Sequence, residues 1–259
     1  SMQMKHWQKA CIWLTQRTIY VLKIRRNWYG TVQLKQACLY TCRSEWMQGG
    51  SYTETMIHQL IETYGLQSYG ITILVGGTAL LWKKLAVPSK KREEACQMAV
   101  WDEALGDGSS LYAFDLQATG HAYPDGTYEW LLGAYPYDLV TAVLDAFESH
   151  ACLVDCIDVV PAAAGRLCPQ GDGTLYLPAG KEEIHVIGLK QGVPLSYGIA
   201  SQLPQDAWQW LEDAALPEET WLWRDETAQC WMPAPIHASA KKQQAQWDIP
   251  CPAVLLTAF

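Results

Sequence analysis

The side chains that could carry chemistry are spread along this chain of 259 residues without a catalytic spacing. Asp155 and Asp158 are the carboxylates best placed for paired acid and base work, but a spacing of three residues puts them on opposite faces of a strand. Ser196 and Ser201 lack the G-x-S-x-G turn that exposes a nucleophilic serine. The sequence therefore predicts no catalytic residues and a protein that is not an enzyme.

The histidines show no spacing typical of a metal site. No pair of them forms H-x-H, H-x-x-x-H or H-E-x-x-H, the patterns that bring two imidazoles to one ion. His185 lies close to Glu183 in an apolar run, and we expect it on the exposed face of a strand. The sequence thus predicts neither a metal site nor a bound cofactor. The histidines are His6, His58, His121, His150, His185 and His237.

Two pairs among the nine cysteines have a spacing that could suggest a metal site. They are Cys38 with Cys42 and Cys152 with Cys156. Both pairs lie in apolar segments typical of strands, where positions i and i+4 are about 13 Å apart. One ion cannot span that distance, and zinc ribbons use a shorter spacing. We expect buried thiols instead, which indicates a reducing compartment.

Anion-binding signals are weak. Arg25 and Arg26 could meet an anion in a cleft, but a solvated turn explains them better. Gly76-Gly77 makes a poor phosphate loop because no helix begins directly after it, and the chain has no G-x-x-x-x-G-K-[ST] motif.

Tryptophan is unusually frequent, with 13 residues against 3 phenylalanines. Trp221 and Trp223 alternate on one face of an expected strand, so they are the candidate anchors for a protein partner. Core packing is the alternative, because large aromatic side chains also fill small cores. A site that stacks sugars is a third possibility.

Charge and hydropathy exclude several classes of partner. The net charge of −8 opposes binding to nucleic acid or to an anionic membrane. No apolar run approaches the roughly 18 residues of a membrane helix, and the N-terminal segment lacks the features of a signal peptide. We therefore expect a cytoplasmic protein without a membrane span of its own.

The elements that would position these side chains alternate between strands and helices. Apolar patterns predict hairpins over 19–40, 71–87 and 110–135, and helices over about 53–64, 88–105 and 137–149. A strand over 152–160 is followed by a short alanine-rich helix. The last third predicts a meander over 175–200, a helix over 204–216 and short strands over 221–223, 229–232 and 253–259. This order is typical of an α/β fold with mixed sheets.

Three segments in the middle of the chain carry a resemblance. They are the strand pair 71–88 that ends in proline and leads into a helix, the strand 128–136 that ends in Ala-Tyr-Pro, and 152–163, with Asp158 and Pro161 before an alanine-rich helix. In this order and spacing they resemble the PilM family of actin-like pilus assembly proteins.

The resemblance implies an actin-like fold made of two RNase H-like subdomains. The first would comprise 1–70 and 155–170, the small inserted subdomain 71–154, and the second, shortened subdomain 171–259. The short second half is similar to the cytoplasmic part of GspL-type secretion proteins.

An ATP-binding member of such a fold needs an Asp-x-Gly hairpin in each half, because backbone amides hold the phosphates and the acid holds magnesium. The first hairpin, expected at 22–27, has neither acid nor glycine. The second, expected at 175–184, keeps Gly180 but has Leu177 and Pro178 where the acid would be. We therefore expect ATP to bind more weakly than about 1 mM.

The resemblance then implies a non-catalytic cytoplasmic scaffold of a type IV pilus or type II secretion-like assembly. Such a protein binds a cytoplasmic peptide of an inner-membrane partner, and the assembly ATPase is a further partner that the resemblance suggests. The alternative is an ATP-binding enzyme of the actin or sugar-kinase fold with divergent phosphate loops. A carbohydrate-binding module built on the tryptophans is a third hypothesis, which the cysteines disfavour.

Overall fold

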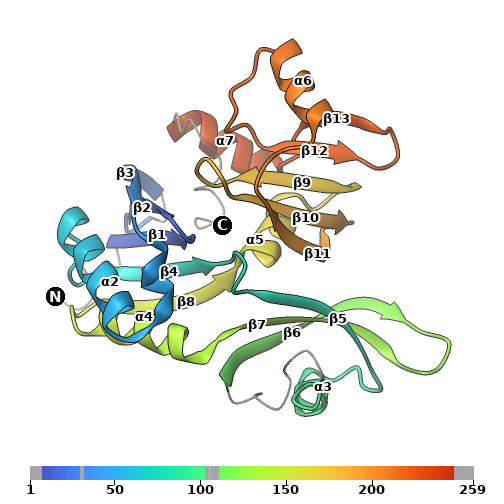
Figure 1. Ribbon diagram of the computed structural model, residues 1–259, viewed down its shortest axis with the longest axis horizontal. Coiled ribbons are helices and arrows are strands. Elements are labelled where there is room, and N and C mark those ends of the chain that lie inside the picture. Colours follow the sequence, from blue (N-terminus) through green and yellow to red (C-terminus); the bar gives the residue numbers. More distant parts are fainter. Residues whose placement is uncertain (1–7, 30–31, 103–104, 106–110, 248–259) are drawn as a thin grey trace.

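Three β-sheets organise the chain in a computed structural model, which describes all residues except 1–7, 30–31, 103–104, 106–110 and 248–259. Two five-stranded sheets lie at either side of helix α5, and a three-stranded sheet projects away from them (Figure 1). Within the described residues, no helix is both long and apolar enough to cross a membrane.

The first sheet has the strand order β3-β2-β1-β4-β8. Its first three strands are antiparallel neighbours, whereas β4 and β8 run parallel to β1. The strand bounds are β1 Gln8–Leu14, β2 Thr18–Arg26, β3 Val32–Thr41, β4 Gly70–Val75 and β8 Leu153–Val159.

The central strand is β1, which the sequence analysis missed. Ala10, Ile12 and Leu14 pack on one face of the sheet, while Cys11 and Trp13 pack on the other. Burial on both faces produces a short continuous apolar run, which periodicity alone cannot distinguish from a buried helix segment. The expected hairpin of β2 and β3 is confirmed, although β2 lies beside the centre of the sheet and not at it.

Helices cover both faces of this sheet. The 3-10 helix η1 (Ser44–Gln48), α2 (Gly50–Tyr64) and α4 (Tyr137–Glu148) pack on the face of Ile12, and α5 (Val160–Leu167) packs on the face of Trp13. Helix α2 ends as predicted at Gly65, whose left-handed φ of 63° lets its N–H reach the carbonyl of Ile61.

The three-stranded sheet has the order β5-β7-β6, and helix α3 (Arg92–Ala99) covers one of its faces. Its strands are β5 Leu81–Val87, β6 Tyr112–Ala122 and β7 Tyr128–Pro136. The pairing of β6 with β7 confirms one predicted hairpin. The hairpin predicted over 71–87 is wrong, because β4 pairs with β1 in the first sheet while β5 pairs with β7.

The limits of the expected inserted subdomain therefore change. Strand β4 and helix α4 lie within 71–154, yet both pack into the core of the first sheet. The sheet that is inserted between them spans only Leu81–Pro136. The turn at Gly76-Gly77 carries the chain out of the first sheet, so it is a crossing point and not a hairpin loop.

The second five-stranded sheet repeats the spatial order of the first, as β11-β10-β9-β12-β13. The predicted meander is confirmed in β9 (Asp172–Pro178), β10 (Ile184–Lys190) and β11 (Val193–Ala200). Here the fourth strand, β12 (Leu222–Asp225), runs antiparallel to β9, and it forms a hairpin with β13 (Cys230–Pro233). Helices α6 (Gln205–Asp213) and α7 (Ala238–Trp247) complete this half. The strand expected at 253–259 lies outside the described residues.

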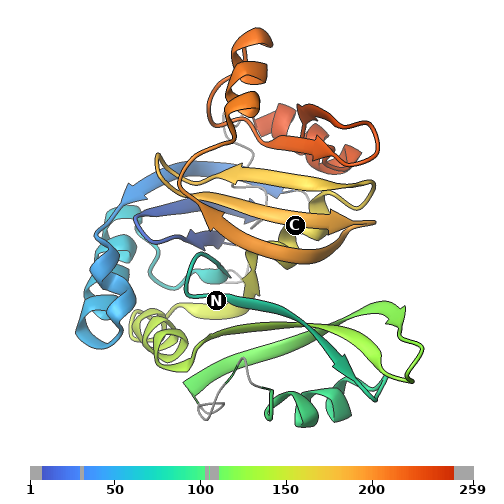
Figure 2. The ribbon, with the colours of Figure 1, turned by 45° about the vertical axis from the view of Figure 1, so that its right-hand side comes forward.

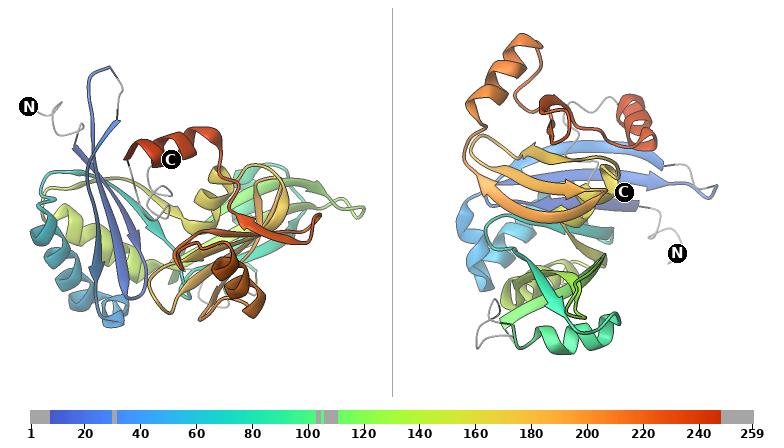
Figure 3. Two further views of the ribbon diagram at one scale, coloured as in Figure 1. Left: turned by 90° about the horizontal axis from the view of Figure 1, so that it is seen from above. Right: turned by 90° about the vertical axis from the view of Figure 1, so that its right-hand side faces the viewer.

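One apolar core joins the two halves. Trp13, Tyr20 and Leu22 of the first sheet belong to the same buried cluster as Leu175 and Ile187 of the second, with α5 between them. Figure 3 shows the two sheets from above, with α7 over the space between them. Figure 2 shows the β9–β10–β11 meander beside the three-stranded sheet.

Candidate functional site at the facing hairpins

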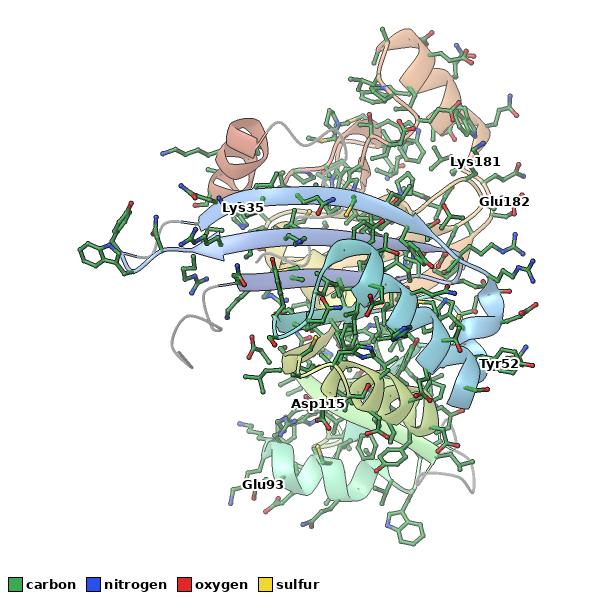
Figure 4. The ribbon with its side chains drawn as sticks, turned by 90° about the vertical axis from the view of Figure 1, so that its left-hand side faces the viewer. Lys35, Tyr52, Glu93, Asp115, Lys181 and Glu182 are labelled. Atoms are coloured by element: carbon green, nitrogen blue, oxygen red, sulfur yellow. The ribbon has the colours of Figure 1, made fainter. Side chains whose placement is uncertain are left out.

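The turns that begin the two halves meet at the junction of the molecule. The β1–β2 turn lies against the β9–β10 turn, where the N–H of Gly180 donates to the hydroxyl of Tyr20 at 3.2 Å. Arg17 and Glu182 form an exposed ion pair at 3.4 Å across the same contact. Figure 4 shows Lys181 and Glu182 at the tip of the β9–β10 turn. These two turns are called the facing hairpins below.

The first of the facing hairpins is not the one that the sequence analysis chose. Because β1 is the first strand, the hairpin that corresponds to a phosphate loop is Thr15-Gln16-Arg17, and not 22–27. Arg25 and Arg26 lie exposed at the far end of β2, so they do not face the junction. The correct hairpin also lacks an acid and a glycine, and Thr15 and Thr18 close it by bonding to each other.

A buried chain of polar groups lies behind the facing hairpins. The N–H of Gly77 donates to the hydroxyl of Tyr197 at 2.5 Å, and this hydroxyl lies 2.6 Å from Nδ1 of His185. A hydroxyl can accept two hydrogen bonds and donate one, so the direction of its hydrogen bond with Nδ1 follows the tautomer of His185. Nε2 of His185 lies 3.2 Å from Oε1 of Glu183, but the two groups are not aligned for a hydrogen bond.

His185 is fully buried, which corrects the expectation of a surface position. Its ring packs edge-on against Trp13 at 5.1 Å between ring centres. Burial raises the pKa of Tyr197 far above its ordinary value, the Glu183 charge adds to this shift, and the N–H of Gly77 opposes it. Tyr197 therefore stays protonated and keeps the polar chain intact at any physiological pH.

The junction leaves little room for a nucleotide. A Cβ atom on Gly76 would lie 2.6 Å from Cγ2 of Val160 and 2.7 Å from the Tyr197 hydroxyl, so backbone and side chains are already in contact there. The carboxylates around the hairpins are also engaged: Glu182 pairs with Arg17, Glu183 faces His185, and Asp158 pairs with Arg166. This arrangement favours a closed, structural junction over a magnesium or phosphate site.

The structure separates the two carboxylates that the sequence analysis considered as a pair. Asp155 lies 3.5 Å from Lys9, whereas Asp158 bonds to Arg166 and to the N–H of Val159. Each carboxylate thus has its own cation, and they do not face one another as an acid and base pair would.

Trp221 and Trp223 are both buried, with 2% and 1% of their surface exposed. They do share a face, and that face belongs to the core that joins the two halves. The ring of Trp223 lies directly over the backbone of Gly173, where a Cβ would come within 2.4 Å of it. Trp221 and Trp223 are therefore not the exposed anchors that we expected. They pack in the core, which was the alternative.

A groove opens between the three-stranded sheet and the second half of the chain. It holds about 450 Å³ and lies between the edge strands β5 and β11. Nε1 of Trp82 donates to the carbonyl of Pro194 at 2.8 Å and links the two walls. This β5–β11 groove is lined by Lys84, Thr119, Gly120, His121, Glu129, Lys190, Gln191, Val193 and Leu195.

Charge in the β5–β11 groove is mixed. Burial would raise the pKa of Glu129, but hydrogen bonds from Tyr123 and Thr119 and the charges of Lys84 and His121 outweigh it, so the pKa is lowered. Glu129 is thus a carboxylate at neutral pH, and its near neighbour Lys84 partly balances it. Lys190, on the opposite wall, is exposed.

The strand orders define the class of the fold. A mixed sheet of order β3-β2-β1-β4-β8, a second sheet of the same order and a smaller sheet inserted in the first half make an actin-like α/β fold. Neither a family model nor a curated protein matches the sequence.

Solved structures with this fold include a PilM-PilN type IV pilus biogenesis complex, at 13% identity and a TM-score of 0.59 over 80% of this chain. Another is the cytoplasmic domain of EpsL, an inner-membrane component of the type II secretion system of Vibrio cholerae, at 14% identity and a TM-score of 0.50 over 82% of this chain and 76% of that one. A Bacteroides thetaiotaomicron protein with an actin-like ATPase fold and unknown function has a TM-score of 0.47 at 7% identity, covering 84% of this chain and 81% of its own. The chain spans 65% of the length of the matched chain in the pilus biogenesis complex. At the level of the fold, the resemblance that the sequence suggested is confirmed.

Proposed function

We propose that this protein is a non-catalytic scaffold of a type IV pilus or type II secretion-like assembly. It would act in the cytoplasm, held at the inner face of the membrane by an inner-membrane partner. The observation that carries the proposal is the closed junction. The first of the facing hairpins has no acid, the second has Leu177 and Pro178 where the acid of a phosphate site is expected, and the Tyr197–His185 chain lies behind them. In a protein of this fold that has no nucleotide site, function would come from binding to partners at its surface.

Two of the solved structures that share this fold support the proposed role, because both come from pilus or secretion assemblies. One is a complex of PilM with PilN, and the other is the cytoplasmic domain of an inner-membrane secretion component. A scaffold of this kind would connect a membrane protein to cytoplasmic parts of the machine, and the assembly ATPase is the cytoplasmic partner that we propose.

The β5–β11 groove is the proposed site for a peptide of the membrane partner. An extended peptide can pair with the exposed main chain of an edge strand, and side chains along the groove then give specificity. Val193 and Leu195 offer apolar contacts on one wall. Lys190 is exposed, and none of the described residues that line the groove on its wall is acidic, so the peptide would carry an acidic side chain near it.

Synthetic peptides test this proposal. Overlapping peptides that cover the cytoplasmic segments of inner-membrane proteins encoded beside this chain's gene would be labelled and titrated with the protein by fluorescence anisotropy. We expect one segment to bind saturably, and Lys190→Glu to weaken it about 10-fold or more. Lys181→Glu is the matched control and should bind normally, because Lys181 is also exposed but lies on the β9–β10 turn, outside the groove. Equal affinity for both variants, or no binding by any segment, would argue against the groove.

The alternative of an ATP-binding enzyme makes the opposite prediction for a nucleotide titration. Because the junction is closed, the scaffold role requires that magnesium-ATP bind no more tightly than about 1 mM. The peptide experiment tests only the groove, and the nucleotide experiment tests only the closed junction. A negative result in one therefore leaves the other claim standing.

A further inference from the structure

Two histidines and a glutamate from distant parts of the chain converge on the face of the first sheet that α2 and α4 cover. His58 and Glu62 lie one turn apart on α2, and His150 follows the end of α4. One donor atom from each residue lies within 4.8 Å of the other two. Nδ1 of His58 and Nε2 of His150 are only 2.6 Å apart.

Two of the three candidate ligands, His150 and Glu62, are oriented by other groups, as metal ligands generally are. Nδ1 of His150 lies 2.9 Å from the carbonyl of Ala146, which can only accept, so Nδ1 carries the proton. The lone pair of Nε2 therefore points at His58. On the other side, the side-chain amide of Gln67 donates to Oε1 of Glu62 at 3.2 Å and restrains that carboxylate.

We propose that His58, Glu62 and His150 bind a divalent transition-metal ion of the Zn²⁺ type. Two imidazole nitrogens and one carboxylate oxygen are a donor set that suits such ions, and water would complete the coordination. Bond lengths of about 2.0–2.1 Å place tetrahedral donor atoms roughly 3.3 Å apart. The two nitrogens must then separate by roughly 0.7 Å from their present contact of 2.6 Å, and the carboxylate oxygen must approach from as much as 4.8 Å. Side-chain rotations would supply both adjustments.

A hydrogen bond between the two imidazoles would by itself explain their short contact. It does not explain why the carboxylate of Glu62 faces the same point, or why both His150 and Glu62 are held from behind. An ion at this point would tie α2 to the end of α4, the two helices that cover one face of the first sheet. None of the three residues lines the β5–β11 groove or the facing hairpins.

Calorimetric titration of tag-free, EDTA-treated protein with Zn²⁺ tests the site. We expect one saturable site per chain and a higher melting temperature with the ion. His58→Gln should weaken binding at least 10-fold and abolish the thermal shift, and Glu62→Gln should weaken it as well. Glu218→Gln removes an exposed carboxylate elsewhere and should change neither readout.

Cysteine thiolates are the competing ligands, and Co²⁺ as a probe distinguishes them. Binding at the proposed site gives d–d absorption without the intense near-ultraviolet band of a cobalt–thiolate bond. Unfolding midpoints of the metal-free variants in urea would show that they remain folded. Wild-type affinity in His58→Gln, no saturable binding, or a thiolate spectrum that persists in this variant would each overturn the proposal.

Discussion

Replacing Tyr197 with phenylalanine should loosen the junction between the two halves. The hydroxyl of Tyr197, on β11, accepts from the N–H of Gly77 at 2.5 Å and is hydrogen-bonded to Nδ1 of His185 at 2.6 Å. Gly77 lies in the turn that carries the chain out of the first sheet after β4. The Tyr197 hydroxyl therefore links the two halves by a hydrogen bond. The substitution removes the hydroxyl and leaves the ring in place.

The expected loss follows from the groups that are left behind. Gly77 and His185 are both buried, and each would lose a hydrogen-bond partner. An unpartnered buried polar group costs about 1–3 kcal/mol, while the phenyl ring no longer has to bury a hydroxyl. The free energy of unfolding should therefore fall by about 2–4 kcal/mol, a large part of the 5–15 kcal/mol that is typical of a protein.

Urea unfolding followed by circular dichroism and tryptophan fluorescence measures this loss. Tyr52→Phe is the matched control, because Tyr52 is 53% exposed on α2 and its loss should change stability by less than about 0.5 kcal/mol. If Tyr197→Phe unfolds within 0.5 kcal/mol of that control, roughly the scatter of surface substitutions, the polar chain does not hold the junction closed.

Two further predictions concern burial. Trp223→Ala should destabilise the protein by about 3–5 kcal/mol because its ring fills the shared core, whereas Trp101→Ala, at 86% exposure, should have little effect; equal melting temperatures would contradict this assignment. Burial, helped by the Glu183 charge, raises the pKa of Cys42 from 9.0 to about 11. At pH 8 the thiol should therefore be alkylated about 100-fold more slowly than an ordinary cysteine, and a normal rate would contradict its burial. Because the folded state keeps this proton longer than the unfolded state does, stability should fall as pH rises from about 9 to 11, and less so in Cys42→Ala.

Local patterns predicted much of the fold. The β2–β3 and β6–β7 hairpins each show two strand-like segments on either side of a polar turn, and α2 has both its apolar stripe and its terminal Gly65. Strand β1 was missed because its apolar run is short and buried on both faces, and periodicity alone cannot distinguish such a run from a buried helix segment. That miss shifted the first phosphate hairpin by one strand, from the β1–β2 turn to the β2–β3 turn.

The site depended on contacts that no local pattern encodes. His185 meets Trp13 from the other half of the chain, so its burial follows from how the two halves pack. The approach of His58 to His150 joins residues 92 positions apart. The sequence did show that His58 and Glu62 are one helical turn apart, and this spacing was the available signal. The tryptophans could not be sorted by alternation alone, since a strand face that alternates can point into a core.

Calorimetric titration with magnesium-ATP tests the central claim most directly. If the facing hairpins and the Tyr197–His185 chain close the junction, no heat of saturable binding should appear up to about 1 mM nucleotide. Micromolar affinity would contradict the closed junction and would favour an ATP-binding enzyme over a scaffold.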